Sequence, residues 1–334
     1  HGLFLYTPSG KVTVYNANNT KLFHENNPIE SLFIDSKDRI WIGLPNQLIV
    51  GSISANGQIL LPEQKGIEQV RMMKEDQYGH LWIGSWNGLI RINSDLTPDN
   101  QPKRIYQRNI PDFYVGYSGD LIFSSYGEGI YFLSKDDTIP MIIEVPEIAR
   151  LAAQTCVTLF GDSHGKIWAG SYGHGMICLA EDTCLIYTKE NGLPNNNVLC
   201  FQEDQVGCLW ISTSNGISKF DPEKKSFTNY SINDGTLGNQ YHEKGGLSHS
   251  DGRIFFTGNH GLTFFNPMAE MPVQSPPNII LEDLKILNQS VQPRHDTSTL
   301  HMNIAYASKI QLKHRQSVVS IDYPGLYFVS HGTL

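Results

Sequence analysis

The chain has 334 residues and a formal net charge of −8, with 40% hydrophobic and 17% charged residues, as in an ordinary globular protein. No basic stripe is present, which argues against nucleic-acid binding. No run of eighteen apolar residues occurs, so the sequence predicts no transmembrane helix within it.

One sequence pattern recurs along the chain and predicts its architecture. Its six copies lie at residues 35–48, 76–89, 119–130, 162–176, 204–217 and 251–262. One position of the pattern recurs every 40 to 46 residues, filled by Trp41, Trp82, Ile122, Trp168, Trp210 and Phe255. A period in this range is the signature of a propeller or a solenoid.

Each copy contains the signals of short antiparallel strands. In the clearest copy, Asp76 and Gly79 form a turn signal, because Asp bonds its own backbone and Gly takes positive φ without strain. Residues 81–84 follow as a strand, and Asn87-Gly88 is a strong hairpin signal before the next strand, residues 89–92. With a fourth apolar run closing the unit, each copy predicts one four-stranded propeller blade.

In chain order, residues 1–16 are expected to supply the last two strands of one blade, residues 29–240 about five blades, and residues 241–266 three strands of another. The predicted fold is therefore all-β, a β-propeller of six or seven four-stranded blades over residues 1–267. Either the two partial blades join to close the ring, or the first strands of the opening blade lie outside the given sequence.

A domain boundary is predicted at residues 268–278, which form a proline-rich linker. Further strands are expected at Ile279–Asn288, Ile310–Leu312, Val318–Tyr323 and Leu326–Val329. Residues 279–334 are therefore expected to begin a β-sandwich, truncated here because immunoglobulin-like sandwiches need roughly 100 residues.

Most of the conspicuous residues are interpreted as scaffold. The recurring Trp is expected to pack between neighbouring blades, since repeats bury together the face that no unit buries alone. The turn Asp and Gly are read in the same way. An odd number of cysteines without a C-x-x-C pair predicts free thiols rather than disulfides or a zinc site. They are Cys156, Cys178, Cys184, Cys200 and Cys208.

The segment from Gly161 to Gly165 fits the G-x-S-x-G pattern of hydrolases. That motif requires a strand-to-helix turn, whereas these residues occupy the strand-to-strand turn of a repeat, so the hydrolase reading is disfavoured. The twelve His residues lack metal-ligand spacing, and neither a metal nor a cofactor is expected.

The repeat pattern Asp-x-x-Gly-x-Leu-Trp-Ile-Gly-Ser-x-x-Gly-Leu resembles the two-component-regulator propeller repeat. Residues 251–267, followed by Pro276-Pro277, resemble the last propeller repeat of hybrid two-component sensor kinases. Residues 310–323 are similar to the opening strands of the Tyr-rich immunoglobulin-like domain that follows it in that family. The first copy departs from the pattern at Asp38 and Gln47, and the third lacks the turn Asp and the Trp.

This resemblance implies a periplasmic sensor region. The family has two tandem propellers outside the inner membrane, then the Tyr-rich domain, a membrane helix, a histidine kinase and response-regulator parts. The chain is similar to the second propeller and the start of the Tyr-rich domain, without kinase residues. The resemblance further implies a homodimeric parent receptor, attached to the membrane only by a helix outside this sequence.

Candidate ligand residues follow from blade topology. The x-Asn-Gly hairpins and the connections between blades should lie at one end of the propeller, the hairpin face, and the Asp-x-x-Gly turns at the opposite end, the turn face. Loops on rigid scaffolds often carry binding groups, and aromatic rings with amides suit a sugar. The candidates are Trp86, Asn87, Tyr126, Glu128, Tyr172, His174, Asn215, His260, Asn239 and Tyr241.

Three functions remain open at this stage. The first is a sensor module that binds a small-molecule ligand, an oligosaccharide, and signals to a transcriptional response. The second is an interaction or dimerisation scaffold whose ligand specificity lies in another domain. The third, a propeller lyase or glycosidase, ranks lowest, because glycoside hydrolysis needs paired carboxylates and Glu128 is the only acidic candidate.

Overall fold

The structure is a computed structural model that describes residues 2–6, 12–16, 28–54, 59–93, 102–180, 183–268, 278–279, 281–293, 299–323 and 325–326. The chain divides into two compact units, His1–Pro267 and Met268–Leu334. Each unit is described by itself.

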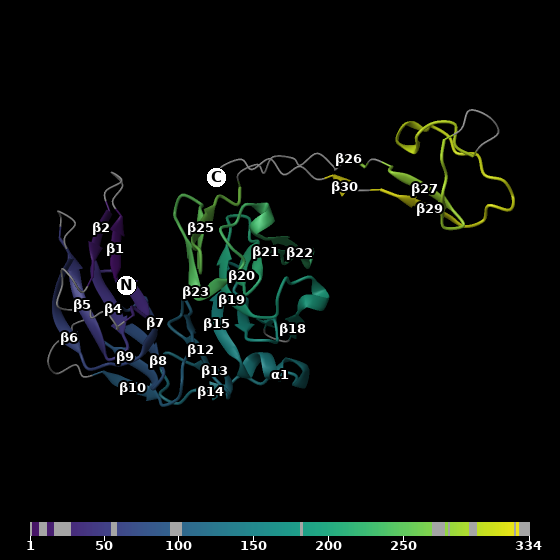
Figure 1. The fold of residues 1–334 in the computed structure, drawn as a ribbon. Helices are drawn as coiled ribbons and strands as arrows, with labels where there is room; N and C mark the ends of the chain where they lie inside the picture. The colour runs from purple at the N-terminus through teal and green to yellow at the C-terminus, as the bar shows by residue number, and fades with distance from the viewer. Residues whose placement is uncertain are drawn as a thin grey trace. The chain divides into compact units, whose positions relative to one another are not determined.

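The described residues of the first unit form seven antiparallel sheets, each built from strands that are consecutive in the chain (Figure 1). The opening sheet pairs β1 (Leu3–Tyr6) with β2 (Val12–Tyr15). The second sheet comprises β3 (Ser31–Ile34), β4 (Arg39–Leu44), β5 (Gln47–Ile53) and β6 (Ile59–Lys65). The third comprises β7 (Val70–Glu75), β8 (Leu81–Ser85), β9 (Gly88–Ile92) and β10 (Lys103–Tyr106).

Three further four-stranded sheets follow, and then a three-stranded one. The fourth sheet comprises β11 (Phe113–Val115), β12 (Leu121–Ser125), β13 (Gly129–Leu133) and β14 (Met141–Ile142). The fifth comprises β15 (Cys156–Gly161), β16 (Ile167–Ser171), β17 (Met176–Ala180) and β18 (Thr183–Tyr187). The sixth comprises β19 (Val198–Glu203), β20 (Leu209–Thr213), β21 (Gly216–Asp221) and β22 (Ser226–Tyr230). The last comprises β23 (Tyr241–Ser248), β24 (Ile254–Gly258) and β25 (Gly261–Phe265).

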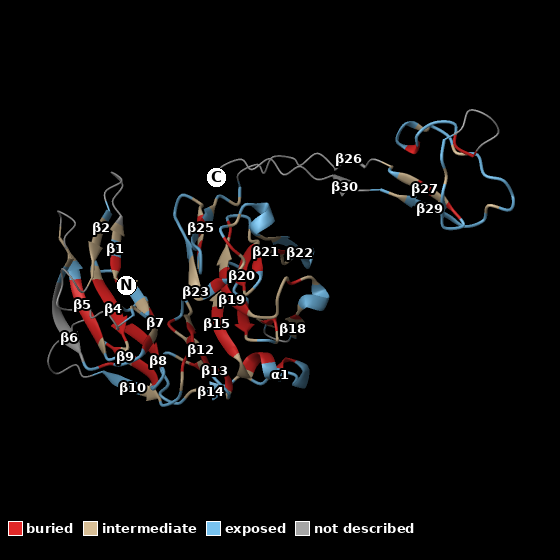
Figure 2. Ribbon diagram, viewed as in Figure 1, coloured by how far each residue is buried: buried red, intermediate tan, exposed pale blue. Residues whose placement is uncertain are grey.

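The predicted all-β propeller is therefore confirmed, with five full blades between two partial ones. The first strands of successive blades, from β3 through β7, β11, β15 and β19 to β23, contact one another in order and are the inner strands. Burial concentrates in the strands next to them, whereas outer strands such as β10 and β14 are largely exposed (Figure 2).

The recurring Trp packs between blades, as predicted. Trp41 lies in one core cluster with Val70 and Met73 of the next blade, and Trp168 lies in another with Val198 and Phe201. Burying these aromatic faces stabilises adjacent blades against each other.

The turn Asp has a specific partner in four of the blades. One carboxylate oxygen of Asp162 accepts a hydrogen bond from the indole N–H of Trp168 at 2.8 Å. The other oxygen accepts hydrogen bonds from the backbone N–H groups of His164 and Lys166. The same arrangement, called here the Asp–Trp clamp, recurs for the pairs Asp35–Trp41, Asp76–Trp82 and Asp204–Trp210.

Helices are few in the described part of the chain. Helix α1 (Glu147–Gln154), which sequence reasoning did not predict, precedes β15 and packs Ala149, Ala152 and Ala153 into the core. Two short 3₁₀ helices, η1 (Lys189–Asn191) and η2 (Ile232–Asp234), follow β18 and β22. No helix of the described residues is long and apolar enough to cross a membrane.

The second unit contains a three-stranded sheet of β28 (Gln289–Ser290), β27 (Asp283–Ile286) and β29 (Val319–Asp322). It also contains the pair β26 (Asn278–Ile279) and β30 (Gly325–Leu326), and the 3₁₀ helix η3 (Ile304–Tyr306). The strand expected at Ile310–Leu312 is not formed; Gln311 instead bonds the carbonyl of Thr299. Residues 327–329 of the last expected strand lie outside the described residues.

Candidate ligand site on the hairpin face

The hairpins and the inter-blade connections meet at one end of the propeller, as the topology predicted. In five blades the first hairpin residue donates its backbone N–H to a carbonyl of the preceding connection, at 3.1 to 3.3 Å. The donor and acceptor pairs are Trp86 and Gln69, Tyr126 and Asn109, Tyr172 and Thr155, Ser214 and Asn197, and Asn259 and Gln240.

Two of the predicted aromatic residues converge on one ion pair. Arg71 of β7 donates to the carboxylate of Glu243 in β23 at 2.8 Å. The Tyr172 hydroxyl donates to the other oxygen of that carboxylate. The Arg71 guanidinium lies 4.8 Å from the ring centre of Trp86 and also bonds the Asn109 amide oxygen at 3.2 Å. These five side chains, from β7, β23 and three loops, are called here the axial cluster.

Strand irregularities position the two charged members of the cluster. The β7–β8 register shifts between Val70 and Met72, so Arg71 sits in a bulge. The β23–β24 register shifts between Tyr241 and Gly246, a segment that includes Glu243. A bulge re-aims a side chain relative to its sheet, which explains how residues of different blades meet.

Sequence reasoning missed Arg71 and Glu243, although a signal existed. The corresponding bulges of β15 and β19 hold Val157 and Leu199, which are buried. A charged residue at this position within an apolar strand is therefore an exception that requires a partner.

Lys244 connects β23 to two other blades. Its ammonium donates to the carbonyl of Pro111 at 2.8 Å and to that of Arg71 at 3.3 Å. Burial lowers the pKa of Lys244 to about 8, although the nearby carboxylate of Asp112 opposes the shift. Its backbone has a φ of 54°, a conformation that is uncommon for a residue with a side chain.

The neighbouring ionisable groups respond to this environment. Burial, together with the hydrogen bond to Glu243, raises the pKa of the Tyr172 hydroxyl, so Tyr172 stays a neutral donor. Partial desolvation raises the pKa of Glu30, an exposed residue, despite the opposing attraction of Arg71 and Lys244. Carboxylates and cations are thus interleaved around the axial cluster.

Glu128 is held in a separate network near the rim of the hairpin face. It accepts hydrogen bonds from the Tyr106 hydroxyl at 2.7 Å, from Arg108 at 2.9 Å and from Ser125 at 3.0 Å. The Tyr106 bond is the largest cause that holds the pKa of Glu128 below its usual range. Tyr126, in the same hairpin, is 46% exposed.

Two other predicted residues have structural roles. The side-chain amide oxygen of Asn239 accepts a hydrogen bond from the backbone N–H of Ile232 and so holds η2 in place. The backbone carbonyl of Asn239 accepts a second hydrogen bond from the N–H of Gly216 at 2.7 Å. Tyr241 does not reach the surface but packs in the core with Phe256.

The remaining candidates lie in the hairpins and are not members of the axial cluster. Three of them are exposed: Asn87, Asn215 and His260. His174 is half-buried. Of the ten predicted residues, only Trp86 and Tyr172 are brought together around a common polar group.

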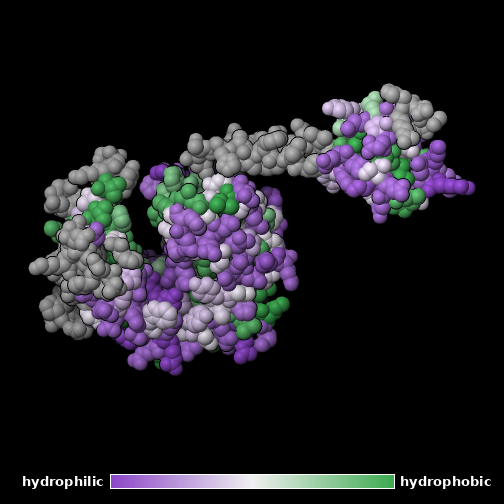
Figure 3. All heavy atoms as spheres, in the orientation of Figure 1, coloured by the Kyte–Doolittle hydropathy of each residue, from purple (hydrophilic) through white to green (hydrophobic). Residues whose placement is uncertain are grey.

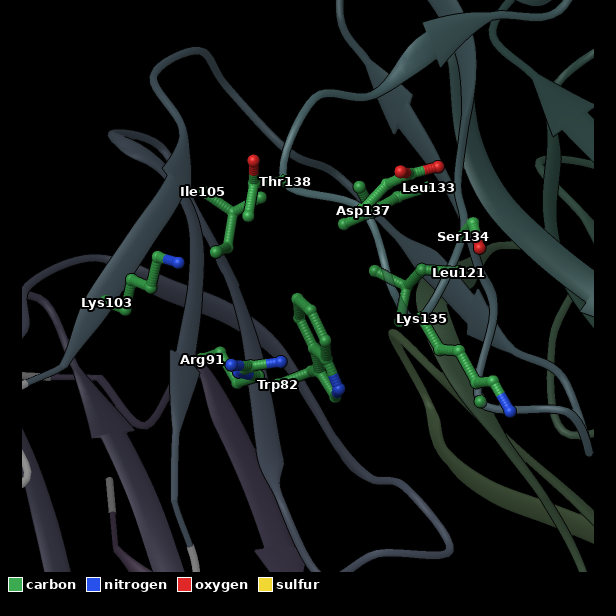
Figure 4. Close-up of a pocket in the computed structure, with 11 residues that line it drawn as sticks. Trp82, Arg91, Lys103, Ile105, Leu121, Leu133, Ser134, Lys135, Asp137 and Thr138 are labelled. Carbon is green, nitrogen blue, oxygen red and sulfur yellow. The ribbon is translucent and has the colours of Figure 1, made fainter.

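The turn face carries inter-blade hollows of different sizes. The hollow between the fifth and sixth sheets has a volume of about 750 Å³ and is lined largely by polar side chains, among them Lys166, Lys219 and Glu223. One gap between the third and fourth sheets has a volume of about 20 Å³, room for about one water molecule. Figure 4 shows Trp82 and Arg91 on one side of it and Leu133, Lys135 and Asp137 on the other. This gap is too small for a sugar, in contrast to the larger hollow between the fifth and sixth sheets.

The G-x-S-x-G segment is confirmed as a scaffold turn. Asp162 belongs to an Asp–Trp clamp, and Ser163 donates its hydroxyl to Glu203 of the next blade at 2.6 Å. No group of three or more potential metal ligands occurs within the described residues. All five cysteines are free thiols, as predicted.

Known proteins with similar sequences and folds show what this chain resembles. The two component regulator propeller repeat matches residues 192–215. Histidine kinase P4 of Formosa agariphila is 25% identical over 350 aligned residues, which cover 96% of this chain and 25% of that protein. The resemblance to sensor regions of two-component systems is thereby confirmed, and the chain spans about a quarter of this relative's length.

Solved structures agree at the level of the fold. The extracellular domain of a hybrid two component system from B. thetaiotaomicron superposes with a TM-score of 0.63 at 18% identity, covering 94% of this chain and 50% of that one. Virginiamycin B lyase from Staphylococcus aureus superposes with a TM-score of 0.57 at 14% identity, covering 78% of this chain and 86% of the lyase. At such identities the likeness concerns the propeller fold alone.

Proposed function

We propose that this chain is the ligand-sensing part of a hybrid two-component sensor kinase, exposed to the periplasm, and that it binds an oligosaccharide on its hairpin face. The propeller repeat and the histidine kinase relative support the sensor role. The observation that carries the ligand site is the convergence of Trp86 and Tyr172 on the Arg71–Glu243 pair.

The chemistry of this cluster suits a sugar. Trp86 is 51% exposed and offers a flat apolar surface, while Glu243 and Asn109 supply polar atoms beside it. Such a combination of aromatic surface and a few fixed polar groups is typical of small-molecule sites. The fragment itself is proposed to be non-catalytic, with the transcriptional output produced by the rest of the receptor.

Signalling requires that the ligand prefer one state of the receptor. Because a ligand shifts an equilibrium only by its difference in affinity between states, binding must favour one arrangement of the sensor domains. The axial cluster joins the third, fifth and last sheets, so a bound sugar would stabilise one arrangement of these blades.

Calorimetric titration of this chain with a panel of plant, host and microbial oligosaccharides tests the proposal. We expect saturable binding that falls by about tenfold or more in Trp86→Ala and by less in Tyr172→Phe. Tyr117→Ala is the matched control, because Tyr117 is 94% exposed in a turn at the opposite end. Silence across the panel, or equal losses in all three variants, would reject the hairpin-face site.

A second candidate function, dimerisation, is favoured by an exposed apolar surface on α1. Ile148 and Leu151 lie one turn apart on its outer side and are 74% and 55% exposed. Figure 3 shows hydrophobic residues gathered where α1 and β18 lie. Exposed apolar patches often mark interaction sites.

The charges of α1 indicate a second copy of this chain as the partner. Glu147 and Arg150 flank the apolar pair and lie 3.2 Å apart within one helix. Two antiparallel copies of α1 would set each Glu147 against the other copy's Arg150, as a two-fold interface requires. We expect Leu151→Asp to weaken self-association in sedimentation experiments by about tenfold or more, with Val206→Asp on the turn face as control. A monomeric wild type at all concentrations would exclude this interface.

A further inference from the structure

The charges of the axial cluster are already engaged with each other. Arg71 donates to Glu243 through one terminal nitrogen and to Asn109 through the other, and its guanidinium carbon lies over the Trp86 ring. Its side chain is only 14% exposed. With two of its five N–H donors engaged and little of its side chain exposed, the guanidinium offers few accessible donors for a paired contact with a ligand carboxylate or sulfate.

The second cation of this region is also committed. Lys244 directs its ammonium to the carbonyls of Pro111 and Arg71, both within hydrogen-bonding distance. Two of the three N–H donors of the ammonium are thus engaged, and displacing either bond would leave a carbonyl oxygen without its donor.

The more exposed charges of this region are carboxylates. The Glu243 side chain is 26% exposed, nearly twice as much as that of its partner Arg71. Glu30, which interacts electrostatically with Arg71 and Lys244, is exposed on the adjoining connection. Each accessible carboxylate accepts hydrogen bonds from neutral hydroxyl groups but repels an anionic one.

We infer that the axial cluster selects uncharged oligosaccharides and rejects uronic-acid and sulfated ones. The inference rests on the proposed function and adds the charge of the ligand to it. Like charges brought together across a binding interface repel each other and so weaken the binding of the wrong partner. Here the carboxylate of Glu243 supplies the repelling charge.

Matched sugar pairs test the inference. Each neutral oligosaccharide of the calorimetric panel is compared with its derivative in which the primary hydroxyls are oxidised to carboxylates, and each acidic member with its carboxyl-reduced form. We expect the neutral member of a pair to bind about tenfold or more tightly than the acidic member.

Glu243→Gln then identifies the selecting group. The substitution removes the negative charge and releases Arg71 from its ion pair. The affinity for the acidic member should therefore rise about tenfold relative to the affinity for the neutral member. Glu203→Gln is the matched control, because Glu203 ends an inner strand at the turn face and bonds Ser163. This control should leave the ratio between the two members unchanged.

The outcomes separate the two proposals. Tighter binding of the acidic member by the wild type, or an unchanged ratio in a folded Glu243→Gln variant, would overturn the charge selection and leave the sugar site in place. Absence of binding by every member would overturn the proposed function itself. A circular dichroism spectrum of each variant confirms that a lost signal does not come from a lost fold.

Discussion

The two ends of the propeller are built by opposite rules. On the turn face, four blades repeat the same Asp–Trp clamp, with each carboxylate buried and satisfied by donors at about 3 Å. On the hairpin face, equivalent positions differ from blade to blade, and Trp86, Tyr126 and Tyr172 occupy places held elsewhere by Ser214 and Asn259. Repetition marks the end that stabilises the fold, and variation marks the end where a ligand site can arise.

The blades that lack the clamp support this reading. In the fourth sheet Gly116 and Ile122 stand where the Asp and Trp would be, and in the last sheet His249 and Phe255 do. Both members of the pair are replaced together, because the indole N–H and the buried carboxylate each need the other as a partner. The clamp therefore behaves as one structural unit.

The largest expected effect comes from breaking a clamp. Asp162→Ala leaves the indole N–H of Trp168 and the backbone N–H groups of His164 and Lys166 without their acceptor. We expect a loss of about 3 kcal/mol in the free energy of unfolding, measured with urea. Asp136→Ala, in an exposed turn, is the control and should change it little. A loss below about 1 kcal/mol would contradict the structural role of the clamp.

A smaller effect concerns Lys244, the half-buried cation near the hairpin face. The folded-state pKa of Lys244, about 8, lies below its ordinary value of 10.5. Between these values the unfolded chain binds more protons, so the contribution of Lys244 to stability rises with pH in this window. Relative to Lys244→Met, the free energy of unfolding of the wild type, measured with urea, should rise by about 1 kcal/mol between pH 7 and pH 9. A constant difference between the two proteins would contradict the lowered pKa.

On the turn face, by contrast, we expect stability to depend on pH in the acid range. Burial alone would raise the pKa of Asp35, but hydrogen bonds from Trp41 and Arg39 outweigh it and hold the pKa below its usual 3.8. This stabilisation is present above about pH 4 and is lost as the pH falls through the folded-state pKa. We therefore expect the stability difference between wild type and Asp35→Asn to shrink under acid. Asp38→Asn is the control, because Asn tolerates its positive φ of 57°.

The sequence predicted those parts of the fold that the repeat pattern determines. The period, the hairpin signals and the Trp positions located the five full blades, and the topology correctly placed the hairpins and connections together. It did not predict α1, whose eight residues are too short for a helical period to stand out and whose buried face is made of alanines. It also missed the axial cluster, because Arg71 and Glu243 lie 172 positions apart and meet only when the blades are arranged around the axis.

The smallest expected change in stability tests the comparison most sharply. Trp82 and Trp86 are four residues apart, yet Trp82 is 4% exposed in a clamp and Trp86 is 51% exposed beside Arg71. We expect Trp86→Ala to change the free energy of unfolding by less than about 0.5 kcal/mol, whereas Trp82→Ala should cost about 3 kcal/mol or more. If urea unfolding gave similar losses for both, Trp86 would be part of the scaffold, and the argument that its exposed ring is kept for a ligand would fail.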